Sequence, residues 1–255
     1  MPRVRPSPDA SNGVVGRLSD AVAPNAAIGD VRRAPASVRT RNRRGQKLGA
    51  KGDRTRMALM EAALELLSSR PIWEIKISDI AGMANVRGPN FYAYFDSVDD
   101  LLLALSEQAT EDLPDMASLI DSGWEVLGGE ACALRLAELS IDYWEKHRPV
   151  LRIVNMLADD GETRFLRARI ARLAPTYRAF RRRIEAAKAA GRLAVGVDPR
   201  LAAYSLAVYL EQWGHHYHLT RREYERDQIV STLGALLFSW LSGLDLFPSS
   251  KDDGP

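Results

Sequence analysis

A short stretch of the chain holds closely spaced side chains that can hydrogen-bond to nucleic acid. Asn90 can bind adenine through two hydrogen bonds, and the hydroxyl groups of Tyr92 and Tyr94 suit phosphate oxygens. Phe91 and Phe95 are four residues apart, so they share one face of a helix. If that face is buried, the three polar side chains lie away from it. The spacing therefore predicts a helix that presents hydrogen-bonding groups to a DNA duplex.

The elements that would position this helix form a helix–turn–helix. We expect a helix over residues 78–84 capped by Ser78, a turn over residues 85–87, and a helix from Pro89 to Phe95. A preceding helix is expected between Asp53, as its N-cap, and Pro71. In this motif the second helix enters the major groove. The predicted DNA contacts are Arg43, Arg44, Lys47, Lys76, Ser78, Arg87, Gly88, Pro89, Asn90, Tyr92 and Tyr94.

These elements resemble the DNA-binding domain of the TetR family of transcriptional repressors. The match rests on residues 90–97 and 100–102, which look like the family's recognition helix and the start of its fourth helix, and on residues 62–67 and 77–81. The resemblance covers roughly residues 53–105. Val98 departs from it, because a lysine that contacts phosphate is usual there. We expect Arg87 to supply the positive charge that Val98 does not.

Charge is distributed unevenly along the 255 residues, although the net charge is only +2. Residues 1–52 hold eleven basic and three acidic side chains, whereas the remainder holds 24 basic and 30 acidic ones. The first 52 residues have no periodic apolar pattern, which predicts a disordered basic arm. The arm either follows DNA through phosphate attraction or is only a solvated tail.

The rest of the chain has helical periodicity and no alternating strand pattern. We expect an all-α protein of about nine helices, with a helix–turn–helix domain over residues 53–96. A larger helical domain for ligand binding and dimerisation follows over residues 97–246, and residues 247–255 are expected to be a disordered tail. A helix is predicted to begin at Ser97. Further helices are predicted at Glu130–Lys146, Pro149–Asp159, Glu162–Ala190, Pro199–Leu219 and Arg226–Leu244.

Large aromatic residues gather in the second domain. For any one of them, core packing is the simpler interpretation, but such a group often lines an apolar cavity between helices. The TetR resemblance implies that a small effector binds in a cavity of this kind. The candidate lining residues are Trp124, Tyr143, Met156, Tyr177, Tyr209, Gln212 and Trp213.

The last two predicted helices have more apolar surface than one domain needs, which indicates a four-helix interface between two copies. The resemblance implies the same homodimer. The predicted interface residues are Leu201, Ser205, Ile229, Leu233, Leu236 and Trp240. A twofold dimer would bind a palindromic operator in double-stranded DNA.

Other classes of function find little support. Glu211, His215 and His218 share a helix face with the spacing of metal ligands, but no fourth ligand is evident, so we expect neither a metal nor a cofactor. The motifs G-x-S-x-G, G-x-x-x-x-G-K-[ST] and G-x-G-x-x-G are absent, so we do not expect an enzyme. Neither a membrane-spanning run nor a secretory signal is evident, which favours a cytoplasmic protein.

The sequence thus predicts a ligand-responsive transcriptional regulator, a repressor that a small apolar or amphipathic effector releases from its palindromic operator. The alternative is an all-α small-molecule sensor whose degenerate helix–turn–helix no longer binds DNA. Val98 is the residue that favours this alternative.

Overall fold

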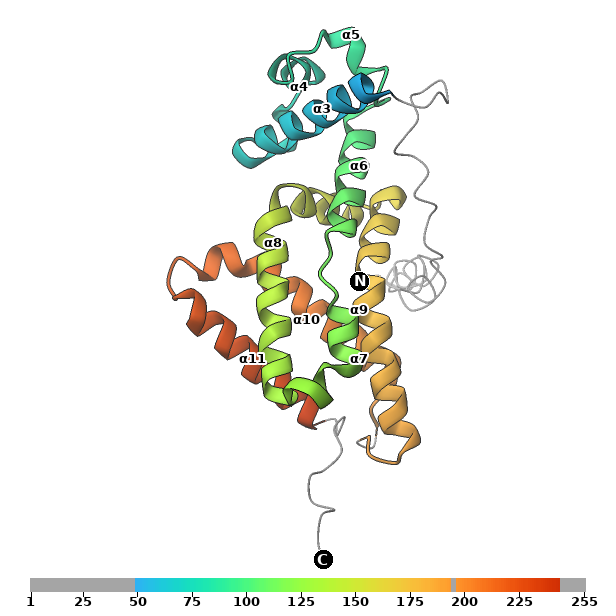
Figure 1. The fold of residues 1–255 in the computed structure, drawn as a ribbon, viewed down its shortest axis with the longest axis vertical. Coiled ribbons are helices and arrows are strands. Elements are labelled where there is room, and N and C mark those ends of the chain that lie inside the picture. The colour runs from blue at the N-terminus through green and yellow to red at the C-terminus, as the bar shows by residue number, and fades with distance from the viewer. Residues whose placement is uncertain (1–48, 194–195, 244–255) are drawn as a thin grey trace, which may run out of the picture.

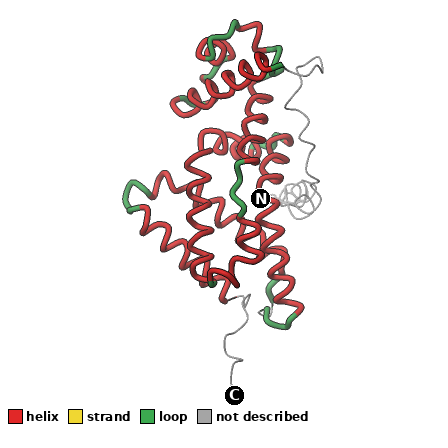
Figure 2. The backbone as a smooth tube through the Cα atoms, in the orientation of Figure 1, coloured by secondary structure: helices red, strands yellow, loops and turns green. Residues whose placement is uncertain are grey.

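The computed structural model describes residues 49–193 and 196–243. Within these ranges the chain forms helices α3 to α11 and one short 3-10 helix, and it contains no strand (Figures 1 and 2). The predicted all-α fold is therefore confirmed. The predicted DNA contacts Arg43, Arg44 and Lys47 lie outside the described residues, as do the expected C-terminal tail and most of the expected basic arm.

The N-terminal unit consists of α3 (Ala50–Ser69), the 3-10 helix η2 (Ile72–Glu74), α4 (Ile77–Met83) and α5 (Gly88–Phe91) (Figure 1). Its core holds Leu59, Ile80 and Phe91, none of which has any exposed surface. Helices α4 and α5 are short, so burial of their apolar faces stabilises them more than their intrinsic helix propensity does.

Two predicted helix starts in this unit were wrong. Helix α3 begins at Ala50 with Gly49 at its N-cap, so Asp53 lies in the first turn and the expected arm ends earlier. Helix α4 begins at Ile77, and Ser78 is not its cap. The backbone N–H of Lys76 instead donates to the Asp79 carboxylate at 3.1 Å, which replaces the expected serine cap.

Helix α5 is also shorter than predicted, because it ends at Phe91 rather than at Phe95. The chain continues as turns, with the N–H groups of Tyr94 and Phe95 both donating to the Phe91 carbonyl. These turns still bury Phe95 beside Phe91, with ring centroids 5.7 Å apart. The predicted aromatic pair therefore forms, although a full helix is not needed to form it.

Helix α6 (Val98–Glu111) connects the N-terminal unit to the larger unit below it (Figure 1). Ser97 caps this helix as predicted, because its hydroxyl oxygen accepts a hydrogen bond from the backbone N–H of Asp100 at 3.2 Å. Asp99 and Asp100 lie in the first turn, where the helix dipole favours negative charge.

The larger unit contains α7 (Met116–Leu127), α8 (Gly129–Asp159), α9 (Thr163–Ala189), α10 (Pro199–Thr220) and α11 (Arg226–Gly243). Helix α7 was not predicted, since a glycine interrupts its short apolar pattern. The break predicted at Pro149 was also wrong: α8 continues through it, and residues on both sides, such as Ile141 and Leu151, are fully buried. Packing on both sides compensates for the backbone hydrogen bond that proline removes.

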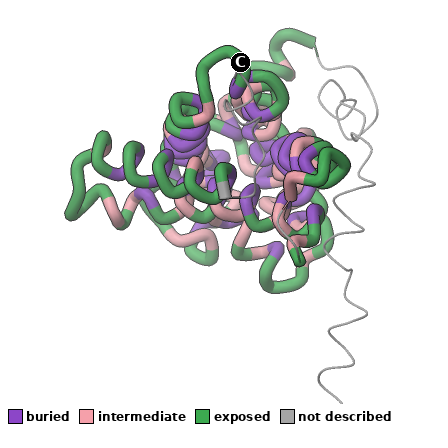
Figure 3. Tube along the Cα trace, turned by 90° about the horizontal axis from the view of Figure 1, so that it is seen from below, coloured by how far each residue is buried: buried purple, intermediate pink, exposed green. Residues whose placement is uncertain are grey.

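Helix α8 is the centre of the larger unit and packs against α7, α9, α10 and α11. Buried positions face the interior of the bundle and exposed positions lie outside (Figure 3). Two glycines allow close helix contact: a Cβ at Gly214 would lie 2.2 Å from Cδ1 of Trp144, and one at Gly234 would lie 2.8 Å from the Leu134 Cα. None of the described helices is long and apolar enough to cross a membrane.

Candidate DNA-binding surface and ligand cavity

Helix α5 and the turn before it present a row of polar groups to solvent. Arg87, Pro89, Asn90 and Tyr92 are exposed, whereas Phe91 on the opposite side is fully buried. The buried aromatic ring fixes how the helix is rotated, so the exposed side chains are held outward together. This is the amphipathic arrangement that the spacing of residues 90–95 predicted.

The remaining predicted contacts surround this row with different degrees of exposure. Lys76 and Ser78 are exposed at the start of α4, whereas Gly88 is half-buried. Tyr94 is also half-buried and packs against the apolar core, so less of its surface is available than expected. Val98 packs against the same core, which gives this departure from the TetR pattern a structural role.

Two arginines of the larger unit hold the end of α3 and the start of α6. The guanidinium of Arg152, on α8, donates to the carbonyl oxygens of Leu67 at 2.7 Å and Arg70 at 3.4 Å, at the C-terminal end of α3. Arg164, at the start of α9, pairs with the carboxylates of Asp99 at 3.2 Å and Asp100 at 3.1 Å. These contacts join α8 and α9 to the helices that carry α5.

The C-terminal end of α6 is held from α8. The Tyr143 hydroxyl donates to the Ala109 carbonyl at 3.0 Å, and Lys146 pairs with the Asp112 carboxylate at 2.9 Å. Burial raises the pKa of Tyr143 to about 12, so its phenol stays protonated and able to donate at neutral pH. The last turn of α6 is therefore linked to a buried residue of the larger unit.

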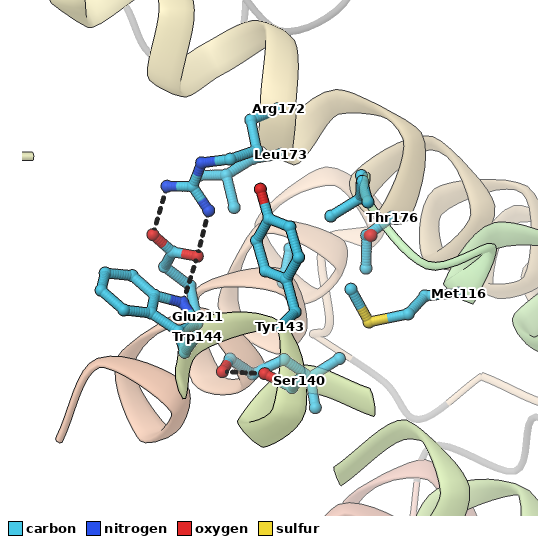
Figure 4. Close-up of a pocket in the computed structure, with 11 residues that line it drawn as sticks. Met116, Ser140, Tyr143, Trp144, Arg172, Leu173, Thr176 and Glu211 are labelled. Carbon is cyan, nitrogen blue, oxygen red and sulfur yellow. Dashed lines mark hydrogen bonds and ion pairs between the residues drawn. The ribbon is translucent and has the colours of Figure 1, made fainter. Parts of the chain in front are cut away.

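Tyr143 also lines a cavity among α7, α8, α9 and α10 (Figure 4). The cavity has a volume of about 20 Å³, which is room for about one water molecule. Most of its wall is apolar, with a few polar groups. It is lined by Leu113, Met116, Ser140, Tyr143, Trp144, Arg172, Leu173, Thr176, Ala207, Leu210 and Glu211.

A buried ion pair forms one side of this cavity. Arg172 and Glu211 are only 2% and 7% exposed, and they form two parallel hydrogen bonds of 2.5 and 2.6 Å. Trp144 Nε1 and Asn155 Nδ2 each donate to a Glu211 oxygen at 3.1 Å. Burial opposes ionisation of Glu211, but the Arg172 charge and these hydrogen bonds hold its pKa below the usual value. Both partners are therefore charged at neutral pH.

The cavity contains only one of the seven predicted ligand contacts, Tyr143. Trp124 on α7 and Tyr177 on α9 are buried in the same core cluster, and Trp213 is half-buried against a smaller cluster. The hydroxyl of Tyr209 donates to the Leu233 carbonyl at 3.2 Å, away from the cavity. Two predicted contacts are exposed at the surface, Met156 and Gln212.

Sequence reasoning missed the ion pair that distinguishes this cavity. Arg172 lies seven residues after Phe165 and seven before Ala179, both of which are fully buried. A charged residue at an apolar position of a helix was the available signal. The sequence places Glu211 on one helix face with His215 and His218, where we expected no metal. Its oxygens bind Arg172, Trp144 and Asn155, and the described residues include no group of three potential ligands that could hold a metal ion.

The predicted dimer residues divide into two groups. Ile229 and Leu233 are 7% and 3% exposed and pack against α8 of the same chain, so they do not present an interface. Leu201, Leu236 and Trp240 are 60%, 43% and 48% exposed, and Ser205 is exposed beside them on α10. The exposed residues therefore form the outer face of α10 and α11, and the buried ones support that face from within.

Comparison with known proteins agrees with this architecture. Residues 59–105 match the family model described as bacterial regulatory proteins, tetR family. Residues 116–243, half of the chain, match the model described as tetracyclin repressor-like, C-terminal domain. This chain belongs to the TetR family. Because the family consists of regulatory proteins, the prediction that the chain is not an enzyme is confirmed.

Individual TetR relatives are more distant. The transcriptional regulator EthR from Mycobacterium tuberculosis is 36% identical over 66 residues, which cover 26% of this chain and only 30% of EthR. NalD from Pseudomonas aeruginosa, the secondary repressor of the MexAB-OprM multidrug efflux pump, is similar with a TM-score of 0.56 and 21% identity. That match covers 75% of this chain and 97% of NalD.

Another similar structure contains a bound molecule. FadR from Bacillus subtilis, in complex with stearoyl-CoA, is similar with a TM-score of 0.54 and 16% identity. The match covers 73% of this chain and 98% of FadR. At these identities the structural similarities establish the shared fold, whereas the ligand and the DNA site of this chain must be argued from its own residues.

Proposed function

We propose that this protein is a DNA-binding transcriptional regulator that responds to a small molecule. In its ligand-free form it would act as a repressor on a palindromic operator, within the cytoplasm. The observation that carries the proposal is the exposed polar row on α5, held outward by the buried ring of Phe91. An N-terminal helix–turn–helix with this arrangement is suited to the major groove.

The cavity supports a mechanism for ligand response. Leu113 and Met116 form part of its wall, and they lie directly after the last turn of α6. A ligand larger than the present cavity must displace this wall and disturb the hydrogen bond from Tyr143 to the Ala109 carbonyl. Movement of α6 would change the spacing of two α5 helices in a dimer. The ligand must bind the two states with different affinity for this to release DNA.

Gel-shift binding to the DNA upstream of the protein's own gene tests the DNA-binding proposal. We expect Asn90→Ala and Tyr92→Ala each to weaken specific binding at least about tenfold, since each removes a base or phosphate contact worth roughly 1–3 kcal/mol. Tyr224→Ala is the matched control, because this exposed tyrosine lies between α10 and α11, outside the helix–turn–helix. Unchanged operator binding by both α5 variants would overturn the assignment of α5 as the recognition helix.

We also propose that the protein is a homodimer that associates through α10 and α11. The segment from Gln228 to Gly243 contains no charged residue, and Leu236 and Trp240 are exposed on it. Leu236→Glu should convert the dimer to a monomer in light scattering and abolish cooperative operator binding. Val126→Glu, at another exposed apolar position on α7, is the control and should leave the dimer intact.

A second candidate is a small-molecule sensor that does not bind DNA. Val98, in place of a phosphate-binding lysine, is the observation that favours it. The two functions differ in the salt dependence of DNA association. A DNA-binding regulator should lose affinity steeply as salt increases, because phosphate contacts release counterions, whereas a pure sensor should show no association to weaken.

A further inference from the structure

The charge balance of the cavity restricts the kind of ligand that it can bind. Of its eleven lining residues, two are ionisable at neutral pH, Arg172 and Glu211, and they neutralise each other. A charged ligand would have to give up its hydration without a free counter-charge, which is costly in a buried site. The wall therefore disfavours both carboxylates and ammonium groups.

The same wall contains a donor that lacks an acceptor. Both terminal nitrogens of Arg172 bind Glu211, and the Tyr143 hydroxyl interacts with the same guanidinium, but Nε of Arg172 makes no hydrogen bond of normal geometry to a described residue. The side chain is 1% exposed, so water in bulk cannot satisfy this N–H group. An unsatisfied buried donor is energetically costly, and an acceptor oxygen on a ligand would remove that cost.

Three other polar groups of the wall are already engaged. The Ser140 hydroxyl donates to the Leu210 carbonyl at 2.6 Å, and the Tyr143 hydroxyl donates to the Ala109 carbonyl. Trp144 Nε1 donates to Glu211. Apart from the Thr176 hydroxyl, the remaining surface is apolar. Leu113 and Met116 lie just before and at the start of α7, where flexible side chains can make room.

From this arrangement we infer that the cavity selects an uncharged, mainly apolar ligand with one acceptor oxygen, such as an ester or a ketone, which accepts a hydrogen bond from Arg172 Nε. The inference rests on the proposed function only in assigning the effector to this cavity. Its chemical content, the preference for a neutral acceptor over either charge, comes from the Arg172–Glu211 pair.

The test compares three probes of similar length: methyl octanoate, octanoate and octylammonium. Their dissociation constants for the full-length protein would be measured by isothermal titration calorimetry at pH 7.5. We expect methyl octanoate to bind at least about tenfold tighter than either charged probe, because only the charged probes bring an unpaired charge into the wall. Equal or tighter binding of a charged probe, or no binding of the ester up to its solubility limit, would overturn the inference.

Variants of the ion pair sharpen this test. Glu211→Gln leaves Arg172 without a counter-charge, so the preference should reverse in favour of octanoate. Glu138→Gln makes the same substitution at a surface carboxylate of α8, which pairs with Arg135 outside the cavity, so it should keep the preference for the ester. If both variants rank the three probes as the wild type does, the ion pair does not control selection and the inference fails.

A paired replacement covers the case in which Glu211→Gln does not fold. Arg172→Met combined with Glu211→Met removes both charges together, a change that buried pairs often tolerate. This variant should bind methyl octanoate about tenfold more weakly than the wild type, because the ligand oxygen loses its donor. Unchanged affinity for the ester would show that Arg172 Nε is not the contact.

Operator binding separates this inference from the proposed function. Gel shifts without any probe measure whether the protein binds DNA, independently of its ligand ranking. Wild-type protein that ranks the probes as expected but binds no operator would overturn the regulator and leave the ligand preference standing. Protein that binds its operator but prefers octanoate would overturn the inferred ligand preference and leave the proposed regulator standing.

Discussion

Two groups of ion pairs connect distant helices in this protein, and their surroundings differ sharply. Arg172 and Glu211 join α9 to α10 in the interior, with 2% and 7% of their surfaces exposed. Arg164 joins α9 to α6 through Asp99 and Asp100 at the surface, where their side chains are 34–45% exposed. A buried pair cannot lose one partner without a large penalty, whereas water replaces a lost partner at the surface.

The difference assigns separate roles to the two groups. The interior pair has few alternatives to its present geometry, because Trp144 and Asn155 also bind Glu211. It is therefore suited to fix the chemistry of the cavity. The surface pairs can break and re-form at little cost, which would suit a junction that changes its geometry in the proposed ligand response.

Loss of one buried partner should have the largest effect. Glu211→Ala leaves the Arg172 guanidinium unpaired in the interior, so we expect the free energy of unfolding to fall by about 3–5 kcal/mol. Urea denaturation of the full chain measures this change. The paired Arg172→Met and Glu211→Met variant is the control and should stay close to wild type. Similar losses in both variants would mean that packing, rather than an unpaired charge, causes the effect.

Lowering the pH should weaken the Arg172–Glu211 pair, and with it the stability of the fold, without any mutation. The folded-state pKa of Glu211 lies below its usual value of 4.5, so its pairing contributes fully above about pH 4.5 and is lost as pH falls through the lower folded-state pKa. Chemical denaturation between pH 3 and pH 7, chosen to span roughly this window, should show a steeper loss for wild type than for the paired methionine variant. Parallel pH profiles would contradict the assignment of Glu211 as ionised.

Local sequence patterns predicted the buried and exposed sides of α5 more accurately than they predicted the lining of the cavity. The Phe91 and Phe95 spacing predicted which side of α5 is buried, because that signal lies within one helical turn. The partners of Arg172 and Tyr143 come from helices far along the chain, and no local pattern specifies those contacts. Periodicity predicts that a side chain is buried but not which distant residue it meets, so six of the seven predicted ligand contacts lie elsewhere.

An intermediate effect is expected where α8 meets the end of α3. Arg152 is half-buried and donates to the carbonyls of Leu67 and Arg70, so Arg152→Ala should lower the free energy of unfolding by about 1–2 kcal/mol. Arg222→Ala, at an exposed arginine beyond α10, is the control and should have little effect. Equal stability of the two variants in urea denaturation would show that the carbonyl contacts contribute nothing measurable.

The smallest effect on stability is expected at the exposed ion pairs, whose loss should instead change operator binding. Arg164→Ala should leave the urea midpoint unchanged within error, because solvent screens these charges. The same variant should alter operator affinity, since Arg164 holds the start of α6 directly after the recognition unit. Gel shifts at low and high salt distinguish the two roles: the difference from wild type should shrink as salt screens the pairs. A fall in stability as large as that of Glu211→Ala would remove the distinction between the buried pair and the surface pairs.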